Sequence, residues 1–259
     1  MSLNDIITIF SFLLGLAIGS FLNVCIYRIP LKKSLIYPPS SCPQCGERIR
    51  FYDNIPIISY IVLSGRCRRC GKPISTGYPL VELIMGLLSL CLFVRYGLSH
   101  QYFLLLIFSA SLIVISIIDL RHQIIPDIIS IPGIVSGLLI SIIFGDIKWH
   151  DSLIGAIAGG GILYIVAEVY FLLTGKEGMG GGDIKLLAMI GAWMGWKALP
   201  EIILISSFTG IIIGGTALVL THKGMRAKIP FGPFLVLGAL ACLFFKQPID
   251  AVFKYYFYF

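Results

Sequence analysis

Long apolar stretches alternate with short polar ones along most of the chain. Eight stretches are long enough, or nearly so, to cross about 30 Å of hydrocarbon as helices. They lie near residues 5–27, 79–96, 101–118, 128–144, 152–173, 184–199, 202–220 and 231–246. The pattern predicts an all-α polytopic membrane protein with about eight transmembrane helices. The stretch at 184–199 is the shortest, so we expect it to be tilted or only partly inserted.

Composition supports this fold class. Of the 259 residues, 57% are hydrophobic and 13% are charged, and the mean hydropathy is +0.93. A soluble domain carries about 25% charged residues, so this chain has too few to cover a surface that faces water. No Lys or Arg precedes the first apolar stretch and no A-x-A-like cleavage site follows it. We therefore expect residues 1–28 to be retained as the first transmembrane helix rather than removed as a signal peptide.

Positive charge is distributed unevenly among the polar segments. If the amino terminus lies outside, fifteen of the twenty Lys and Arg residues fall on the cytoplasmic side, in segments 28–72, 121, 176–185 and 223–228. The positive-inside rule predicts this orientation, with the amino terminus outside and the first long polar segment in the cytoplasm. The net charge of +7 is then explained by topology and by attraction to anionic lipid. We expect no nucleic-acid partner.

Four cysteines lie in the first long polar segment, 29–77. They form two C-x2-C pairs with twenty-one residues between them: Cys42, Cys45, Cys67 and Cys70. Two such pairs can supply a closed tetrahedral zinc site. Disulfides are the first rival, but a cytoplasmic loop is kept reduced; a redox site is the second, but it needs only one pair. We predict a structural metal held by all four cysteines, zinc or another thiolate-bound ion, that lets this small loop fold as a domain.

Three aspartates lie at predicted cytoplasmic helix ends. Asp119 closes the third apolar stretch, Asp127 opens the fourth, and Asp183 opens the sixth directly after a run of glycines. Helix capping is the simple explanation for an Asp at a helix start, and we favour it for Asp127. It does not explain the glycines before Asp183, nor Asp119, where the helix dipole disfavours an anion. Glu168, inside the fifth stretch, is a further buried candidate, for which hydrogen bonding to a neighbouring helix is the simpler role.

Two carboxyl groups at one membrane depth can form a catalytic pair. When two carboxyls share a site, one stays protonated while the other activates water, and this arrangement suits peptide hydrolysis without a metal. Asp183 lies at the positive end of its helix dipole and Asp119 at the negative end of its own. From the dipoles alone we expect Asp183 to be the base and Asp119 the acid.

Several motifs resemble the type IV prepilin peptidase family. They are "GSFLNVCIYRIP", the two C-x2-C pairs followed by "YPLVEL", "DLRHQIIPD", "GMGGGDIKLLAMIGAWMGW" and "IPFGPFLVLGAL", and they run from about Gly19 to Leu240. The resemblance implies a catalytic pair at Asp119 and Asp183, with the G-x-G-D motif supplied by Gly180 and Gly182. It also implies that the four cysteines bind the metal.

The resemblance further implies a bifunctional enzyme. Such an enzyme cleaves the short basic leader of type IV prepilins, or of the pseudopilins of type II secretion, and then N-methylates the new amino terminus with S-adenosylmethionine. The domains expected are the first helix at 1–28, the four-cysteine metal-binding loop at 29–77 and a transmembrane aspartic peptidase at 78–259. The alternative is a transporter or channel with a zinc-folded regulatory loop. Nothing in the residues indicates the methyl-donor site, the particular pilin or the oligomeric state.

Overall fold

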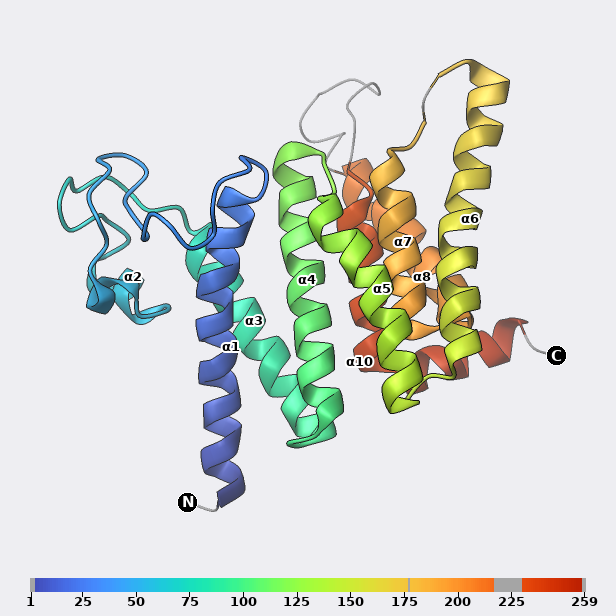
Figure 1. Ribbon diagram of the computed structural model, residues 1–259, viewed down its shortest axis with the longest axis horizontal. Coiled ribbons are helices and arrows are strands. Elements are labelled where there is room, and N and C mark those ends of the chain that lie inside the picture. Colours follow the sequence, from blue (N-terminus) through green and yellow to red (C-terminus); the bar gives the residue numbers. More distant parts are fainter. Residues whose placement is uncertain (1–2, 177, 217–229, 258–259) are drawn as a thin grey trace. The chain divides into compact units, whose positions relative to one another are not determined.

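The computed structural model describes residues 3–176, 178–216 and 230–257, and within these ranges the chain is helical with no β-strand. The longer helices are α1 (Leu3–Arg28), α3 (Gly77–Tyr96), α4 (His100–His122), α5 (Asp127–Phe144), α6 (Trp149–Thr174), α7 (Gly181–Met194), α8 (Leu199–Thr209) and α10 (Gly232–Phe257) (Figure 1). Short elements are η1 (Phe51–Asn54), α2 (Ile58–Val62), η2 (Trp196–Ala198) and η3 (Gly210–Gly214).

The chain divides into two compact units, Met1–Val114 and Ile115–Phe259, and the boundary falls inside α4. In the first unit α1 packs along α3 (Figure 1). The Ser89 hydroxyl of α3 bonds the Ser11 carbonyl of α1 at 2.7 Å and the Tyr102 hydroxyl at 2.8 Å. The loop between α1 and α3 carries η1 and α2.

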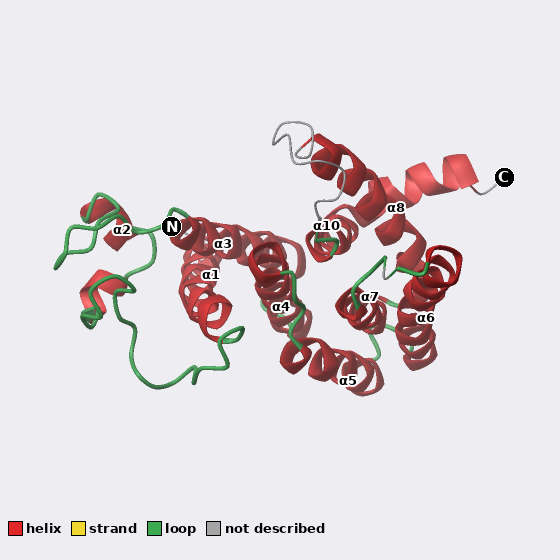
Figure 2. Cartoon of the chain, turned by 90° about the horizontal axis from the view of Figure 1, so that it is seen from above, coloured by secondary structure: helices red, strands yellow, loops and turns green. Residues whose placement is uncertain are grey.

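The second unit is built around α7. Every residue from 186 to 193 of this helix is buried, which is the pattern of a helix surrounded by others. Its neighbours are α5, α6 and α10, and Figure 2 shows α5 and α6 flanking it. Gly155 of α6 and Gly191 of α7 meet so closely that a Cβ on either would overlap the backbone of the other. Small residues at this contact let the two helices approach closely, as is common in membrane bundles.

The predicted fold class is confirmed, and each of the eight apolar stretches contains a helix. Six helices in the described ranges are long and apolar enough to span a membrane, including one that runs from Trp196 to Gly214, so the protein is a multi-pass membrane protein. The short stretch at 184–199 forms α7, whose fourteen residues extend about 21 Å. Lys223, Arg226 and Lys228, counted above for orientation, lie outside the described residues. The division into three domains remains a prediction.

Candidate active site and metal centre

Asp119 lies in the last turn of α4, as the sequence predicts. Its carbonyl accepts the Gln123 N–H at 2.8 Å, where the helix ends. The side chain is buried, with 5% of its surface exposed. Its Oδ2 accepts a hydrogen bond at 3.1 Å from the backbone N–H of Gly232, the first residue of α10. Since the first N–H groups of a helix have no partner within that helix, α10 offers this donor to the carboxylate.

Asp183 is the third residue of α7, and Gly180 occupies the N-cap position. The capping explanation for Asp183 is therefore wrong, because no side-chain cap bond forms and the Asp183 N–H bonds the Gly180 carbonyl at 3.1 Å. Its Oδ1 is buried and has no hydrogen-bond partner among the residues that the structure describes. An unsatisfied carboxylate oxygen is costly in a protein interior, so this atom is exceptional for a structural residue.

The side chain of Ile125 links the surroundings of the two aspartates. A Cβ placed on Gly182 would lie 2.8 Å from Ile125 Cβ, and one placed on Gly232 would lie 3.3 Å from Ile125 Cδ1 and 2.6 Å from Asp119 Oδ2. Glycine is therefore needed at both positions, because a larger residue would overlap these neighbouring side chains. The two carboxylates are near enough for the charge of Asp119 to act on Asp183. The segments that carry them converge on one site in the second unit.

Gly180 and Gly182, which the motif pairs, differ in their surroundings. Among the described residues, a Cβ on Gly180 would make only an ordinary contact, 3.8 Å from Asp183 Oδ2, and one on Gly181 would have no neighbour within 4 Å. Gly180 also has φ −74°, which any residue can adopt. Of the two motif positions, only 182 requires glycine, because the side chain of Ile125 lies too close for a Cβ there.

Asp127 and Glu168 do not join this site. Asp127 was expected to cap α5, but Pro126 is the N-cap residue and no side-chain cap bond forms. The Asp127 carboxylate instead pairs with Lys185 Nζ at 2.7 Å, with both side chains substantially exposed. Glu168 was expected to be buried and is exposed on α6.

The four predicted cysteines form one cluster. The Sγ atoms of Cys42, Cys45, Cys67 and Cys70 all lie within 4.8 Å of one another, and those of Cys42 and Cys70 are 3.9 Å apart. A tetrahedral ion with Zn–S bonds of about 2.3 Å requires sulfur atoms about 3.8 Å apart, so the cluster fits such an ion. With four sulfurs present, no coordination position remains open for substrate.

Two nearly identical turns hold the sulfurs. In the first, the Gly46 N–H bonds the Cys42 carbonyl at 2.8 Å; in the second, the Gly71 N–H bonds the Cys67 carbonyl at 2.9 Å. Both glycines have positive φ, 72° and 68°, which a glycine adopts without strain. Backbone N–H groups of Cys70 and Arg69 donate to the Cys67 sulfur and lower its pKa to about 7. Cys67 is thereby favoured as a thiolate, the form that binds metal, whereas desolvation and hydrogen bonds to the Cys42 and Cys70 thiols raise the pKa of Cys45 to about 11.

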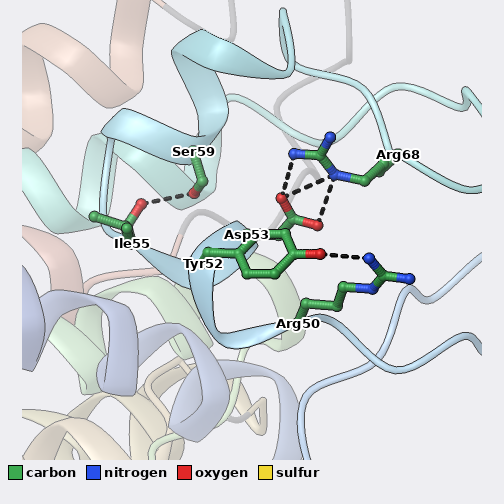
Figure 3. A network of polar contacts seen from close by, with 6 residues as sticks. All are labelled: Arg50, Tyr52, Asp53, Ile55, Ser59 and Arg68. Carbon is green, nitrogen blue, oxygen red and sulfur yellow. Dashed lines mark hydrogen bonds and ion pairs between the residues drawn. The ribbon is translucent and has the colours of Figure 1, made fainter.

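An ion pair joins η1 to the second cysteine turn (Figure 3). Arg68 donates to both oxygens of Asp53 at 2.7 to 3.0 Å, and this hydrogen-bonded guanidinium lowers the pKa of Asp53. The Tyr52 ring lies 5.7 Å from the Arg68 guanidinium, and its hydroxyl accepts a bond from Arg50. The contacts join η1 to the segment between Cys67 and Cys70.

Sequence reasoning missed Glu82, a buried carboxylate in α3. Its Oε2 accepts the Ile57 N–H at 2.8 Å, and it also hydrogen-bonds the Ser20 side chain of α1. Ile57 has a φ of +60°, a costly conformation for a β-branched residue. The available signal was that Glu82 is the only acidic residue in the apolar stretch at 79–96.

Comparison with known proteins places the two units in one family. Residues 13–96 match the Bacterial Peptidase A24 N-terminal domain. Residues 106–215, which carry both aspartates, match the Type IV leader peptidase family. The chain belongs to the type IV leader peptidase family. The four cysteines fall within the first match and the aspartates within the second.

Curated relatives cover almost the whole chain. A prepilin leader peptidase/N-methyltransferase from Pseudomonas putida is 40% identical over 92% of this chain and 90% of its own length. Proteins of the same name from Burkholderia pseudomallei (strain 1026b) and Pseudomonas aeruginosa are each 38% identical over 92% of this chain, and over 85% and 90% of their own lengths. No solved structure matches the chain significantly.

Proposed function

We propose that this protein removes the leader peptide of type IV prepilins or pseudopilins with Asp119 and Asp183 and then methylates the new amino terminus. The observation that carries the peptidase half is the convergence on one site of a buried carboxylate from α4, Asp119, and a half-buried one from α7, Asp183, whose Oδ1 atom is itself buried. The names of relatives that cover more than nine-tenths of the chain support both halves.

Hydrolysis by such a pair needs one ionised and one protonated carboxyl. The ionised group takes a proton from water as the water oxygen attacks the scissile carbonyl carbon. The protonated group donates to the carbonyl oxygen, and the amine of the mature pilin leaves with a proton when the intermediate collapses. No covalent enzyme intermediate forms, and the two carboxyls exchange protonation states during the reaction.

The surroundings of the pair favour roles opposite to those expected from the dipoles of α4 and α7. Asp119 receives the Gly232 N–H from the start of α10, and a hydrogen bond to a carboxylate favours its charged form. Asp183 Oδ1 is buried, and no group in the described part of the chain donates to it, which disfavours charge on that carboxyl. We assign the base to Asp119 and the acid to Asp183. Carboxyl-carbon NMR at neutral pH would detect the one carboxyl that remains in each of the Asp119→Asn and Asp183→Asn proteins. An ionised Asp183 in the first variant together with a protonated Asp119 in the second contradicts this assignment.

The site is assigned to the cytoplasmic side of a bacterial inner membrane. Support comes from the excess of Lys and Arg in the segments on that side, where anionic lipid also attracts a basic surface. A leader with Lys or Arg stays on the same side by the same rule, so the scissile bond lies at the inner end of the substrate helix. Proteoliposomes of known orientation test this: a leader-containing peptide added outside is expected to be cleaved only when the cysteine loop faces outward.

The four cysteines are proposed to bind one structural zinc ion, because sulfurs at this spacing form a closed site. The ion would supply loop stability rather than chemistry. S-adenosylmethionine is the methyl donor that the N-methyltransferase names of relatives imply. No observation favours a transporter or channel.

The central test is to incubate purified protein with a prepilin, with and without methyl donor, and to follow the pilin by mass spectrometry. Leader loss is expected in both reactions, and the mass of one methyl group is added only with donor. An intact leader after incubation with metal-replete wild-type protein would overturn the peptidase assignment. A leader lost without later methylation would overturn the methyltransferase half alone.

A further inference from the structure

A cavity of about 450 Å³ lies in the first unit between α1 and the loop that follows it. This volume is in the range of about 300–1,000 Å³ that is typical of small-molecule sites. The helix contributes one face, and the loop and the region of η1 contribute the other. Its lining residues are Ala17, Ser20, Phe21, Val24, Arg28, Leu35, Ile36, Pro38, Pro39, Ser40, Asn54 and Pro56. None of them belongs to the aspartate pair or to the cysteine cluster.

One end of the cavity carries a buried positive charge. Arg28 is only 9% exposed, and it donates to the carbonyls of Ser34 at 2.9 Å and Pro38 at 2.6 Å, with a longer contact of 3.5 Å to Pro39. All its hydrogen-bond partners in the described residues are thus neutral carbonyl oxygens. A guanidinium has five N–H donors and prefers an anion. This end is therefore suited to a carboxylate of a ligand.

A buried carboxyl group, that of Glu82, lies behind the opposite end of the cavity and is not itself a lining residue. Ser20 lines the cavity two helical turns before Arg28, a separation of about 12 Å along α1. Its hydroxyl bonds Glu82, which is 8% exposed and also holds the N–H of Ile57, next to the lining residue Pro56. A cationic group near Ser20 is thus favoured by the Glu82 carboxylate.

We propose that this cavity binds the methyl donor of the N-methylation reaction. This inference rests on the proposed function and extends it to a site. A donor with a carboxylate at one end and a sulfonium in its middle matches the two charges: the carboxylate binds Arg28 and the sulfonium lies toward Ser20 and Glu82. The flat base lies against the open apolar wall of the cavity, where Phe21 and Ile36 are 53% and 91% exposed and so remain free to contact a ligand.

The location agrees with the division of the chain. Both aspartates lie in the unit that matches the peptidase family, whereas every cavity residue lies in the unit that matches the separate N-terminal domain.

In the transfer, the amine lone pair of the cleaved pilin attacks the methyl carbon. An N–C bond forms, the C–S bond breaks, and its electron pair returns to sulfur, leaving a neutral thioether. The amine proton passes to water.

The first test is equilibrium binding of isotope-labelled S-adenosylmethionine to the full-length, metal-replete protein in detergent. Val24→Phe fills the cavity and is expected to weaken binding at least tenfold. The matched control is Ile18→Phe, on the same helix at a half-buried position that does not line the cavity, and it should bind as wild type does. Equal affinity in the two variants would overturn the proposal.

The second test separates the charge of Arg28 from its structural role. Arg28→Gln is expected to weaken binding of the donor about tenfold or more, the value of a lost hydrogen bond to a charged group. Decarboxylated donor, which lacks the matching anion, should bind wild type and Arg28→Gln equally. Bound metal is measured in each variant to confirm that the loop is folded. A variant that loses both ligands to the same degree would contradict the assignment of the carboxylate to Arg28.

These outcomes are distinct from failure of the proposed function. Wild-type protein that cleaves and methylates a prepilin while both variants bind donor normally would place the donor elsewhere, with the function intact. Wild-type protein that binds no donor and transfers no methyl group would instead remove the methyltransferase half of the function, and this inference with it.

Discussion

The cysteine loop and the aspartate site reach their geometry by opposite routes. The loop is local: two turns of matching hydrogen bonds bring four sulfurs together within twenty-nine residues, Cys42 to Cys70. The aspartate site is assembled from the end of α4, the start of α7 and the start of α10, and a bond joins residues 113 positions apart. A local site depends on its own ligands and metal, whereas a distributed site depends on helix packing. The two should therefore respond separately to substitution.

The largest expected effect is loss of cleavage in dyad variants. Asp119→Asn or Asp183→Asn removes a group that must hold or release a proton, so cleavage should fall on the order of 10³-fold. Methylation of a pilin supplied without its leader, and bound metal, should stay at wild-type levels. Both are measured on one preparation by mass spectrometry and by metal analysis. Parallel loss of methylation would show that the two regions are not separable.

The next largest effect is expected at Gly232. A Cβ there would overlap Asp119 Oδ2 at 2.6 Å, so Gly232→Ala should displace the carboxylate and lower kcat about 10²-fold. Gly238→Ala is the control on the same helix, because a Cβ at that position is at least as crowded, 2.6 Å from Ser206 Oγ and 2.7 Å from the Ile202 carbonyl oxygen, but touches neither aspartate. If both variants lose kcat equally, general disruption of α10 is responsible rather than the bond to Asp119.

Removal of one sulfur should affect the cysteine loop rather than the aspartate site. Cys42→Ser leaves three thiolates, which form a poorer closed site, so metal content should fall and protease sensitivity of the loop should rise. Methylation is expected to suffer more than cleavage, since the aspartates lie on helices that the loop does not build. Cys25→Ser, at a buried cysteine outside the cluster, is the control. If metal is removed and cleavage is lost before methylation, then the loop supports the aspartate site more than it supports methylation, contrary to this prediction.

The smallest effect should come from Asp127. Its pair with Lys185 is exposed on both sides, and such pairs contribute about 0–1 kcal/mol. Asp127→Asn should therefore leave cleavage within a few-fold of wild type, although Asp127 lies only two residues from Ile125. The kcat/KM for a prepilin measures this directly, and a loss as large as that of Asp183→Asn would place Asp127 in the site.

The sequence was informative where chemistry and spacing coincide. The cysteine pairs could be found because ligand type and turn residues are contiguous, and Asp119 because a carboxylate at a helix C-terminus conflicts with the dipole. Gly232 and Ile125 could not be found, since their roles depend on how distant helices pack. Glu168 was misjudged for the same reason: an apolar helix does not reveal which of its faces is covered. Capping by Asp127 was wrong because α5 begins at Asp127 itself, which leaves Pro126 at the N-cap position.

The shortness of α7 has a consequence for biogenesis. A helix of fourteen residues is below the roughly 20 needed to cross hydrocarbon, and it carries Asp183 and Lys185, which are each costly to insert. Helix α7 should therefore not integrate alone, and should enter the bilayer only with α5 and α6 already in place. In an insertion assay with a glycosylation reporter, α7 alone is expected to fail where α5 to α7 together succeed. Independent insertion of α7 would show that α5 and α6 are not needed for its insertion and contribute only to packing after the protein has folded.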